Sequence, residues 1–399
     1  MDLSSREKLM PREEMLEVAR KGRKFSIGLP KETSFQEKRI ALIPNAVTSL
    51  VENGHEVIIQ REAGLAAHFT DNDYSEAGAR LVDTAEEIFK SDIVLKVAPL
   101  SANEINYMKG RQILLSALHL TGRNKEYFKT LMGKKITAIA FEYIKDKSNA
   151  SPVVKSISEI AGTASIHIAA EYLSNEKYGS GNMLGGFTGI APSEVVIVGA
   201  GTVGEYACKM ALGMGAMVKI FDNSIYKLQR IKSIINPNLY TSTLQPSELT
   251  RALRTADAVI CAIHSKYRRS PVIITEEMVG MMKDGSVIVD VSIDQGGCVE
   301  SSRVTSHNDP VFSYAGVTHY CVPNIASRFP QTASKAISNF FAPMLLKAGE
   351  LGGMDNLLNK DFYFRQGVYL YNGTLTNKII GDCYGFPYQD IDLLMAAFH

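Results

Sequence analysis

The sequence predicts an α/β fold made of two Rossmann-like, doubly wound parallel-sheet domains joined by long helices. Three observations predict it. Two separate series of short apolar runs alternate with amphipathic stretches, which is the pattern of βαβ units. A glycine-rich turn opens the second series. Two long apolar stretches with helical periodicity, at 155–175 and 331–349, enclose that series.

The first series contains five apolar runs of strand length. Stretches with helical spacing, such as Asn45–Asn53 and Thr84–Lys90, separate these runs. Helical connections favour parallel pairing of the strands that they join. The predicted strands are Phe25–Leu29, Glu56–Gln60, Asp92–Val97, Ile113–Leu118 and Thr137–Phe141.

The long helix expected at 155–175 has a start signal of its own. Ser156 and Glu159 have the S-x-x-E spacing of a capping box in front of an apolar run. A glycine-rich loop, 179–189, follows the helix and leads into the second series. The strands predicted there are Val195–Val198, Met217–Phe221, Ala258–Ile263, Ser286–Val291 and Thr318–Val322.

The order of these elements predicts four segments. Residues 1–24 form a charged, mostly helical extension, and 25–153 form the first part of one domain. The second domain spans 154–330, and 331–399 returns to the first domain.

Composition excludes several classes of protein. The 399 residues are 45% hydrophobic and carry 43 basic against 42 acidic side chains, a net charge of +1, which is typical of a globular chain without affinity for nucleic acid or an anionic membrane. The sequence has no apolar run of about 18 residues that could span a bilayer, and no signal peptide at Met1–Lys24. Its five cysteines form no CxxC pair, so we expect no metal site, no disulfide framework and a cytoplasmic location.

The strongest motif is the run from Gly199 to Gly204, Gly-Ala-Gly-Thr-Val-Gly. It follows a predicted strand and opens a predicted helix, which is the context that a dinucleotide fingerprint requires. The first glycine permits the tight turn, Gly201 lets the backbone approach a pyrophosphate, and Gly204 lets helix and strand pack closely. The pyrophosphate then lies at a helix N-terminus.

Asp222 ends the next strand, 18 residues after the last glycine. At this position a carboxylate accepts hydrogen bonds from the hydroxyls of the adenosine ribose, and its charge repels a 2′-phosphate. The motif therefore favours NAD over NADP. Segment 154–330 becomes the NAD-binding domain, and the other domain becomes the substrate domain.

Polar residues at the carboxyl ends of strands are candidates for the chemistry, since ligands bind there in open α/β sheets. Asp294 precedes two glycines, and His119 follows the fourth strand of the first series. A histidine there can shuttle a proton, although a structural histidine and a turn aspartate are the commoner cases. The guanidinium of Arg39 can bind a substrate carboxylate, although a solvated surface arginine is the commoner case. Lys96 interrupts an apolar strand, where a lysine needs a partner or a function. Lys266, Arg268 and Arg269 read as a solvated loop, or less often as phosphate contacts.

Seven motifs in order make the chain resemble the alanine dehydrogenase family, which is related to the NAD-binding subunit of proton-pumping transhydrogenase. The resemblance runs from about residue 27 to about 349. Its motifs are Gly28–Thr33, Arg39–Pro44, Leu118–Leu120, Ser158–Gly162, the glycine fingerprint, Val289–Cys298 (ending in Ile-Asp-Gln-Gly-Gly-Cys) and Tyr320–Asn324.

The resemblance implies roles for matching residues. Arg39 corresponds to the arginine that holds the pyruvate carboxylate, His119 to the general acid/base, and Asp294 to the aspartate that positions ammonia or water and relays protons. Asn324 corresponds to a residue that lines the nicotinamide site. The implied cofactor-binding residues are Ser158, Gly199, Gly201, Thr202, Val203, Gly204, Asp222, Lys227 and Val322. The resemblance also implies a homohexamer.

One position departs from the family. The family's substrate lysine stands where this sequence has Ala98, while Lys96 lies two residues earlier. Strand side chains alternate, so a strand that continued through this segment would point both side chains the same way, and Lys96 becomes a candidate substrate ligand. The expected reaction interconverts L-alanine with pyruvate and ammonia. Two alternatives stay open: a transhydrogenase-like module that binds NAD(H), and a dehydrogenase of a larger amino acid, such as the saccharopine type.

Overall fold

The computed structural model describes residues 22–265 and 269–397. The chain divides into two compact units. Unit 2 is the continuous stretch Lys155–Ala333, and unit 1 contains the chain up to Val154 together with the chain from Ser334 onward. Unit 2 is thus an insertion in the sequence of unit 1. Most of the expected 1–24 extension, residues 1–21, lies outside the described residues.

Unit 1 is built on an eight-stranded sheet of order β15-β14-β6-β5-β4-β1-β2-β3. The six strands β6, β5, β4, β1, β2 and β3 pair in parallel. Strands β14 and β15 extend the sheet beyond β6 by antiparallel pairing. The strands are β1 (Ser26–Leu29), β2 (Glu56–Gln60), β3 (Arg80–Val82), β4 (Ile93–Leu95), β5 (Ile113–Ser116), β6 (Thr137–Ala140), β14 (Val368–Tyr371) and β15 (Thr374–Leu375).

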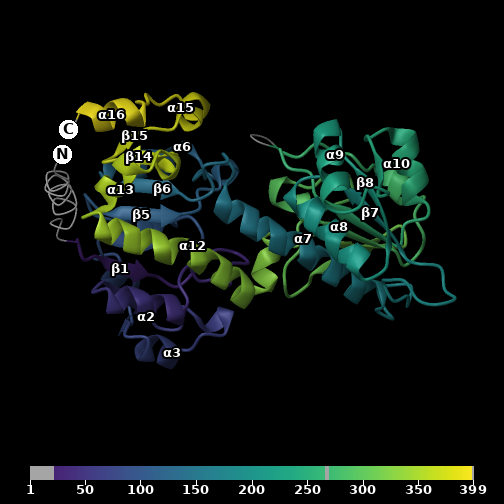
Figure 1. The fold of residues 1–399 in the computed structure, drawn as a ribbon, viewed down its shortest axis with the longest axis horizontal. Helices are drawn as coiled ribbons and strands as arrows, with labels where there is room; N and C mark the ends of the chain where they lie inside the picture. The colour runs from purple at the N-terminus through teal and green to yellow at the C-terminus, as the bar shows by residue number, and fades with distance from the viewer. Residues whose placement is uncertain (1–21, 266–268, 398–399) are drawn as a thin grey trace, which may run out of the picture. The chain divides into compact units, whose positions relative to one another are not determined.

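Helices cover this sheet, and the long helix α12 (Pro330–Glu350) lies across it (Figure 1). The Ser334 hydroxyl of α12 accepts a hydrogen bond from the Ile40 amide at 2.9 Å, which anchors the segment after β1. The other helices of unit 1 are α2 (Pro44–Glu52), η2 (Leu65–Ala67), α3 (Asp71–Glu76), α4 (Ala85–Ile88), α5 (Ala102–Tyr107), η3 (Leu120–Gly122), α6 (Lys125–Gly133), α13 (Met354–Lys360), α14 (Phe362–Arg365), α15 (Lys378–Tyr384) and α16 (Ile391–Ala397).

Unit 2 is built on a seven-stranded sheet of order β12-β13-β11-β10-β7-β8-β9. All pairs are parallel except that of β12 with β13, which adds one antiparallel edge. The strands are β7 (Glu194–Val198), β8 (Met217–Phe221), β9 (Tyr240–Ser242), β10 (Ala258–Cys261), β11 (Val287–Asp290), β12 (Val311–Tyr314) and β13 (Val317–Tyr320). The strand order reverses beside β7, and open α/β sheets bind ligands at the carboxyl ends of the strands that flank such a point.

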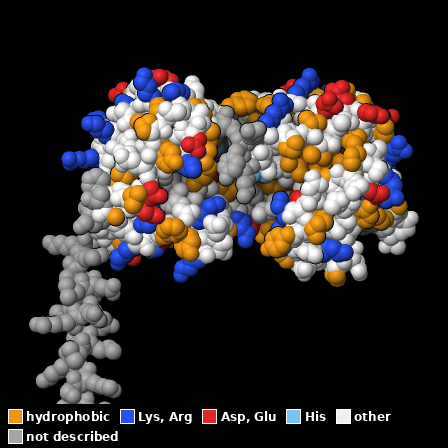
Figure 2. Space-filling model, turned by 90° about the horizontal axis from the view of Figure 1, so that it is seen from above, with side chains coloured by type: hydrophobic (Ala, Val, Ile, Leu, Met, Phe, Trp, Pro, Cys, Tyr) orange, Lys and Arg blue, Asp and Glu red, His pale blue; other side chains and the backbone are white. Residues whose placement is uncertain are grey.

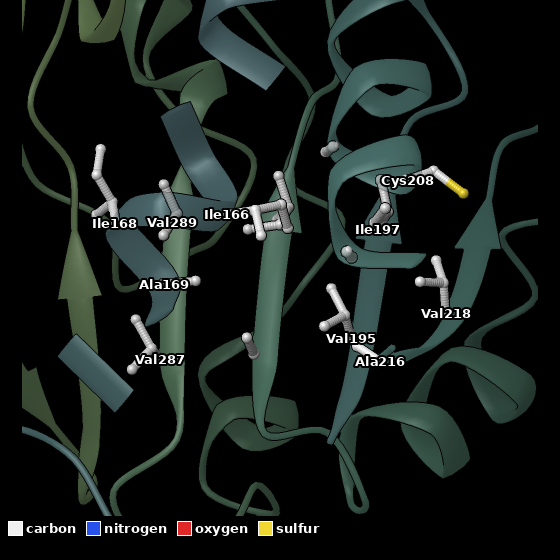
Figure 3. Packing of buried hydrophobic residues seen from close by; sticks show 14 of the residues in the cluster. Ile166, Ile168, Ala169, Val195, Ile197, Cys208, Ala216, Val218, Val287 and Val289 are labelled. Atoms are coloured by element: carbon white, nitrogen blue, oxygen red, sulfur yellow. The ribbon is translucent and has the colours of Figure 1, made fainter. Parts of the chain in front are cut away.

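Two hydrophobic layers hold the sheet of unit 2, one on each face. Figure 3 shows the first layer, in which Ile168 and Ala169 of α7 (Pro152–Leu173) lie near Val287 and Val289 of β11. The central strands β10 and β11 are buried at every position, as expected for parallel strands covered on both faces. The remaining helices are α8 (Thr202–Gly213), α9 (Ile225–Ile234), α10 (Pro246–Leu253), α11 (Glu276–Val279), η4 (Val291–Gln295) and η5 (Ile325–Arg328).

The predicted α/β class is confirmed, and two local predictions are wrong, the start of the long helix and the end of the strand before Lys96. Helix α7 begins at Pro152 rather than near Lys155, so Ser156 lies inside the helix and caps nothing. Proline is favoured at the first helical position, and it starts this helix before the S-x-x-E pattern. In the same way β4 ends at Leu95, so Lys96 follows the strand instead of continuing it.

The surface carries charged side chains of both signs. Figure 2 shows basic and acidic side chains intermingled on the face in view. All five cysteines lie within the described chain and are free thiols, four of them buried. Among the described residues, no helix has both the length and the apolarity needed to cross a bilayer.

Candidate active site

The glycine turn of unit 2 joins β7 to α8, as the fingerprint predicts. Gly199 has φ +115°, and a side chain there would collide with the carbonyl of Ala262, which directly follows the neighbouring strand β10. A side chain at Gly204 would collide with the Gly199 carbonyl, because helix and strand approach closely at this point. Both positions therefore require glycine for the fold itself.

Gly201 differs from the other two glycines. Its backbone has φ −77°, which any residue adopts, and a Cβ there would meet no atom within 4 Å. Glycine at this position is not needed for packing, and the open space lies directly before the first turn of α8, which begins with Thr202 and Val203. A pyrophosphate fits such a position, since helix N-termini offer unpaired amides to anions.

Asp222 lies at the carboxyl end of β8 beside this turn. One carboxylate oxygen accepts a hydrogen bond from the Ala200 amide at 2.8 Å, and the other accepts one from the Ser224 amide at 2.7 Å. The Lys227 ammonium lies 3.4 Å from the same carboxylate. The side chain is thus fixed where the fingerprint places the ribose-binding acid, and Lys227 contributes a second polar group.

Asp294 and Asn324 of unit 2 lie together. Asp294 is in the short helix η4, and one of its oxygens accepts a hydrogen bond from the Asn324 amide at 2.7 Å. Asn324 has left-handed backbone, with φ 57°, at the start of η5. Gly296 and Gly297 have φ +90° and +78°, so the turn after Asp294 requires residues without side chains.

Asp290 is a residue of this loop that the sequence reasoning missed. Its buried carboxylate accepts hydrogen bonds from the amides of Ser292 and Cys298 and from the Ser302 hydroxyl, at 2.7–3.1 Å. Burial raises the pKa of the Asp290 carboxyl, and these hydrogen bonds oppose that rise. Asp290 therefore ties both ends of the loop that carries Asp294.

The remaining cofactor candidates lie on other elements of unit 2. Val322 is buried just after β13. Ser158 lies on α7, one turn before Gly162, where a side chain would collide with the Val203 carbonyl of α8. Next to this contact, Thr163, His167, Tyr206 and Phe329 help to line a mainly apolar cavity of about 320 Å³. Lys266 and Arg268 lie outside the described residues, and Arg269 donates to the Gly296 carbonyl at 3.1 Å.

In unit 1, Arg39 is held by its neighbour Glu37. The guanidinium donates to both carboxylate oxygens of Glu37, at 2.7 and 2.6 Å, and both side chains are almost fully buried. This two-point geometry fixes the plane of the guanidinium. Glu37 was not identified from the sequence.

Lys96 is fully buried. Its ammonium nitrogen lies 2.5 Å from a carboxylate oxygen of Glu104 and 3.6 Å from one of Glu32. Glu32 follows β1, and its carboxylate also accepts a hydrogen bond from the Val97 amide at 2.6 Å. The amine is engaged by two carboxylates, neither of which the sequence reasoning had identified.

His119 is an exposed residue with left-handed backbone, φ 47°, just after β5. One oxygen of Glu142 accepts hydrogen bonds from the amides of Leu118 and His119, at 2.8 and 2.9 Å. Because β1, β4 and β5 are neighbours in the sheet, the segments that carry Glu32, Lys96 and His119 all leave from its carboxyl edge.

Two family models match the chain: Alanine dehydrogenase/PNT, N-terminal domain, over residues 28–161, and Alanine dehydrogenase/PNT, C-terminal domain, over residues 165–378. The chain belongs to the alanine dehydrogenase/PNT family. A curated alanine dehydrogenase from Staphylococcus saprophyticus is 36% identical over 367 residues, which cover 92% of this chain and 98% of the relative. The family resemblance drawn from the motifs is thereby confirmed.

Two solved structures agree with the fold. A structure of L-alanine dehydrogenase has a TM-score of 0.83 and 36% identity, and covers 90% of this chain and 99% of its own. A transhydrogenase from Sinorhizobium meliloti has a TM-score of 0.74 at 23% identity, covering 88% and 99%. The second likeness concerns the fold alone.

Proposed function

We propose that the chain is an NAD-dependent alanine dehydrogenase, which oxidises L-alanine to pyruvate and ammonium and catalyses the reverse reductive amination. The observation that carries this proposal is the match at 36% identity to an alanine dehydrogenase along 92% of the chain, with both family domains present. A transhydrogenase-like module has weaker support, since the solved structure of that name is 23% identical.

The residues of unit 2 fit NAD. The open space at Gly201 and the first turn of α8 suit the pyrophosphate, and Asp222 suits the two ribose hydroxyls. The other residues that we propose to contact NAD are Thr202, Val203, Lys227, Ser158 and Val322. When bound, NAD would accept the hydride that leaves the substrate Cα.

The chain's own residues supply charge and proton transfer. We assign the substrate carboxylate to Arg39, whose guanidinium is oriented by Glu37. Loss of hydride from Cα gives an iminium, and water adds to it. The amine then departs as the carbonyl forms, and His119 and Asp294 accept and return the protons of these two steps. The backbone amide of Asn324 donates a hydrogen bond to the Asp294 carboxylate and so fixes its position.

An absorbance assay at the NADH band tests the function. With pyruvate and ammonium, we expect the chain to oxidise NADH. Oxidation only with a longer keto acid would favour a dehydrogenase of the saccharopine type. NADH binding without oxidation of any keto acid would contradict the proposal and favour the transhydrogenase-like module.

His119→Ala tests the proposed acid/base. We expect turnover to fall by a factor of at least about 100, the usual range for general acid–base catalysis, with NADH affinity nearly unchanged. His68→Ala is a matched control, because His68 is also an exposed histidine of unit 1 with left-handed backbone, φ 60°. If His119→Ala and His68→Ala kept equal turnover, His119 would be removed from the mechanism.

We also propose a homohexamer located in the cytoplasm, since the resemblance implies the hexamer and cysteine usage favours a reducing compartment. Light scattering on the purified protein should then give six times the chain mass of 43.8 kDa. A smaller assembly would contradict the hexamer without bearing on the reaction.

A further inference from the structure

A buried group of charges lies at the carboxyl ends of β1 and β4 in unit 1. Lys96 is its only ammonium among the described residues, and Glu32 and Glu104 are the carboxylates that it contacts. The side chains of all three are at most 9% exposed. None has a role in the reaction described above, which uses Arg39 and His119 from this unit.

Glu32 connects two strand ends. It lies three residues after β1, and its carboxylate accepts hydrogen bonds from the amides of Val97 (2.6 Å) and Ala98 (3.4 Å), which follow β4. Glu104 has its own backbone partner, the Ser101 amide at 2.7 Å, in the capping box of α5. Glu32 is therefore the member of the group that holds the segment at 97–98.

The charges of this group do not balance. The single positive charge of Lys96 neutralises one of the two carboxylates that it contacts. Glu37 is a third carboxylate whose charge acts on Glu32, and Arg39 neutralises Glu37. The described charges that face Glu32 therefore leave one buried negative charge in excess. Burial, opposed by Lys96 and reinforced by Glu37 and Glu104, raises the pKa of Glu32 to about 7.

We propose that Glu32 is a positioning residue for the substrate site, which holds the 97–98 segment and couples its own protonation to the binding of an anionic substrate at Arg39. This inference rests on the proposed function, because it takes a 2-keto acid as the anion. A carboxylate bound at Arg39 adds a negative charge beside Glu37 and Glu32, and like charges disfavour ionisation. Binding therefore favours protonated Glu32, and by linkage a protonated Glu32 favours binding.

The sign of the pH effect follows directly. Below the pKa of Glu32 the side chain is neutral and the anion binds tightly. As pH rises through about 7 the carboxylate ionises, and the affinity for the anion falls. A coupling of one pKa unit corresponds to about a tenfold change in the dissociation constant.

Glu32→Gln tests this coupling, because glutamine keeps an acceptor oxygen for the Val97 amide and removes the charge. The measurement is the dissociation constant of pyruvate from the enzyme–NADH complex, read by NADH fluorescence without ammonium, at pH 6–8.5. We expect a rise of about tenfold over this range in the wild type and a much smaller rise in Glu32→Gln. Glu62→Gln is the control, since Glu62 pairs with Lys31 on the surface of the same unit at 2.8 Å.

Equal pH dependence in the wild type and Glu32→Gln would overturn the proposal. If the wild type neither binds nor turns over pyruvate, the proposed function has failed, and thermal unfolding then tests the charge group by itself. The pKa of Glu32 is higher in the folded than in the unfolded state, so the wild type loses stability as pH rises from about 4.5 to about 7. The melting temperature of Glu32→Gln should therefore exceed that of the wild type by more at pH 8 than at pH 5. An equal difference at the two pH values would reject the unbalanced buried charge.

Discussion

At the scale of single residues, the candidate site depends on carboxylates that hold backbone rather than substrate. His119 has left-handed backbone, which costs a residue with a side chain about 1–2 kcal/mol. Hydrogen bonds to a charged group contribute about 1.5–3 kcal/mol each, so the two that Glu142 accepts from Leu118 and His119 outweigh this cost. Glu142 therefore fixes the backbone from which the proposed acid/base projects.

Glu142→Ala should lower kcat about as much as a misplaced catalytic group does, about 100-fold, while NADH affinity stays unchanged. Glu142→Gln keeps an acceptor oxygen and should restore most of the activity. Steady-state kinetics on both variants make the measurement.

Asp146→Asn is a suitable control for these variants. One oxygen of Asp146 also accepts two backbone amides in unit 1, those of Ser148 and Ala150, in an exposed loop. If Glu142→Ala were as active as Asp146→Asn, the positioning role would be rejected.

Such partners could not be found from the sequence. Glu142 lies 23 residues from His119, and Glu32 lies 65 residues from Val97. The contacts exist because β5 pairs with β6 and β1 pairs with β4, and that pairing is set by the whole sheet. Lys96 shows the same limit: the sequence indicated that it needs a partner or a function, and the structure supplies Glu104 and Glu32.

At the scale of elements, strong periodicity was a reliable guide. The bounds of β2 and β8 match the predicted strands, because both are apolar runs ended by polar or turn residues. Short strands with polar positions gave no such signal, and β3, β9, β12, β14 and β15 were missed. All five lie at or beside a sheet edge: β3, β9, β12 and β15 are edge strands, and β14 lies next to β15. Neighbouring strands rather than the local sequence pattern therefore define them.

The β7–α8 turn gives a prediction at this scale, since two of its glycines serve different needs. Gly201→Ala should leave the melting temperature nearly unchanged, because the added methyl meets no atom within 4 Å. It should weaken NADH binding by tenfold or more, since the methyl fills the space assigned to the pyrophosphate. Thermal unfolding and NADH titration measure the two effects.

Gly204→Ala provides the contrast. Its methyl collides with the Gly199 carbonyl, so we expect a lower melting temperature before any ligand is added. An unaltered NADH affinity in Gly201→Ala, with the fold intact, would show that the space at Gly201 does not receive the cofactor.

At the scale of the whole molecule, the two units do not coincide with the two family models. The C-terminal model covers residues 165–378, whereas the chain from Ser334 onward packs into unit 1. Strand β14 explains this, because it pairs antiparallel with β6 and so extends the sheet of the first unit. The sequence order therefore indicated a return of the chain, and the pairing partner came from the structure.

The proposed reaction uses side chains of both units, which gives a final prediction. His119→Ala and Asp294→Asn should each be inactive alone. Asparagine keeps an acceptor oxygen for the Asn324 amide, so Asp294→Asn should keep its local fold. Oligomers that contain both variant chains, made by co-expression, should also stay inactive if one chain supplies both groups to each reaction. Recovery of activity in the mixed oligomers, measured as NADH oxidation per chain, would show instead that His119 of one copy works with Asp294 of another.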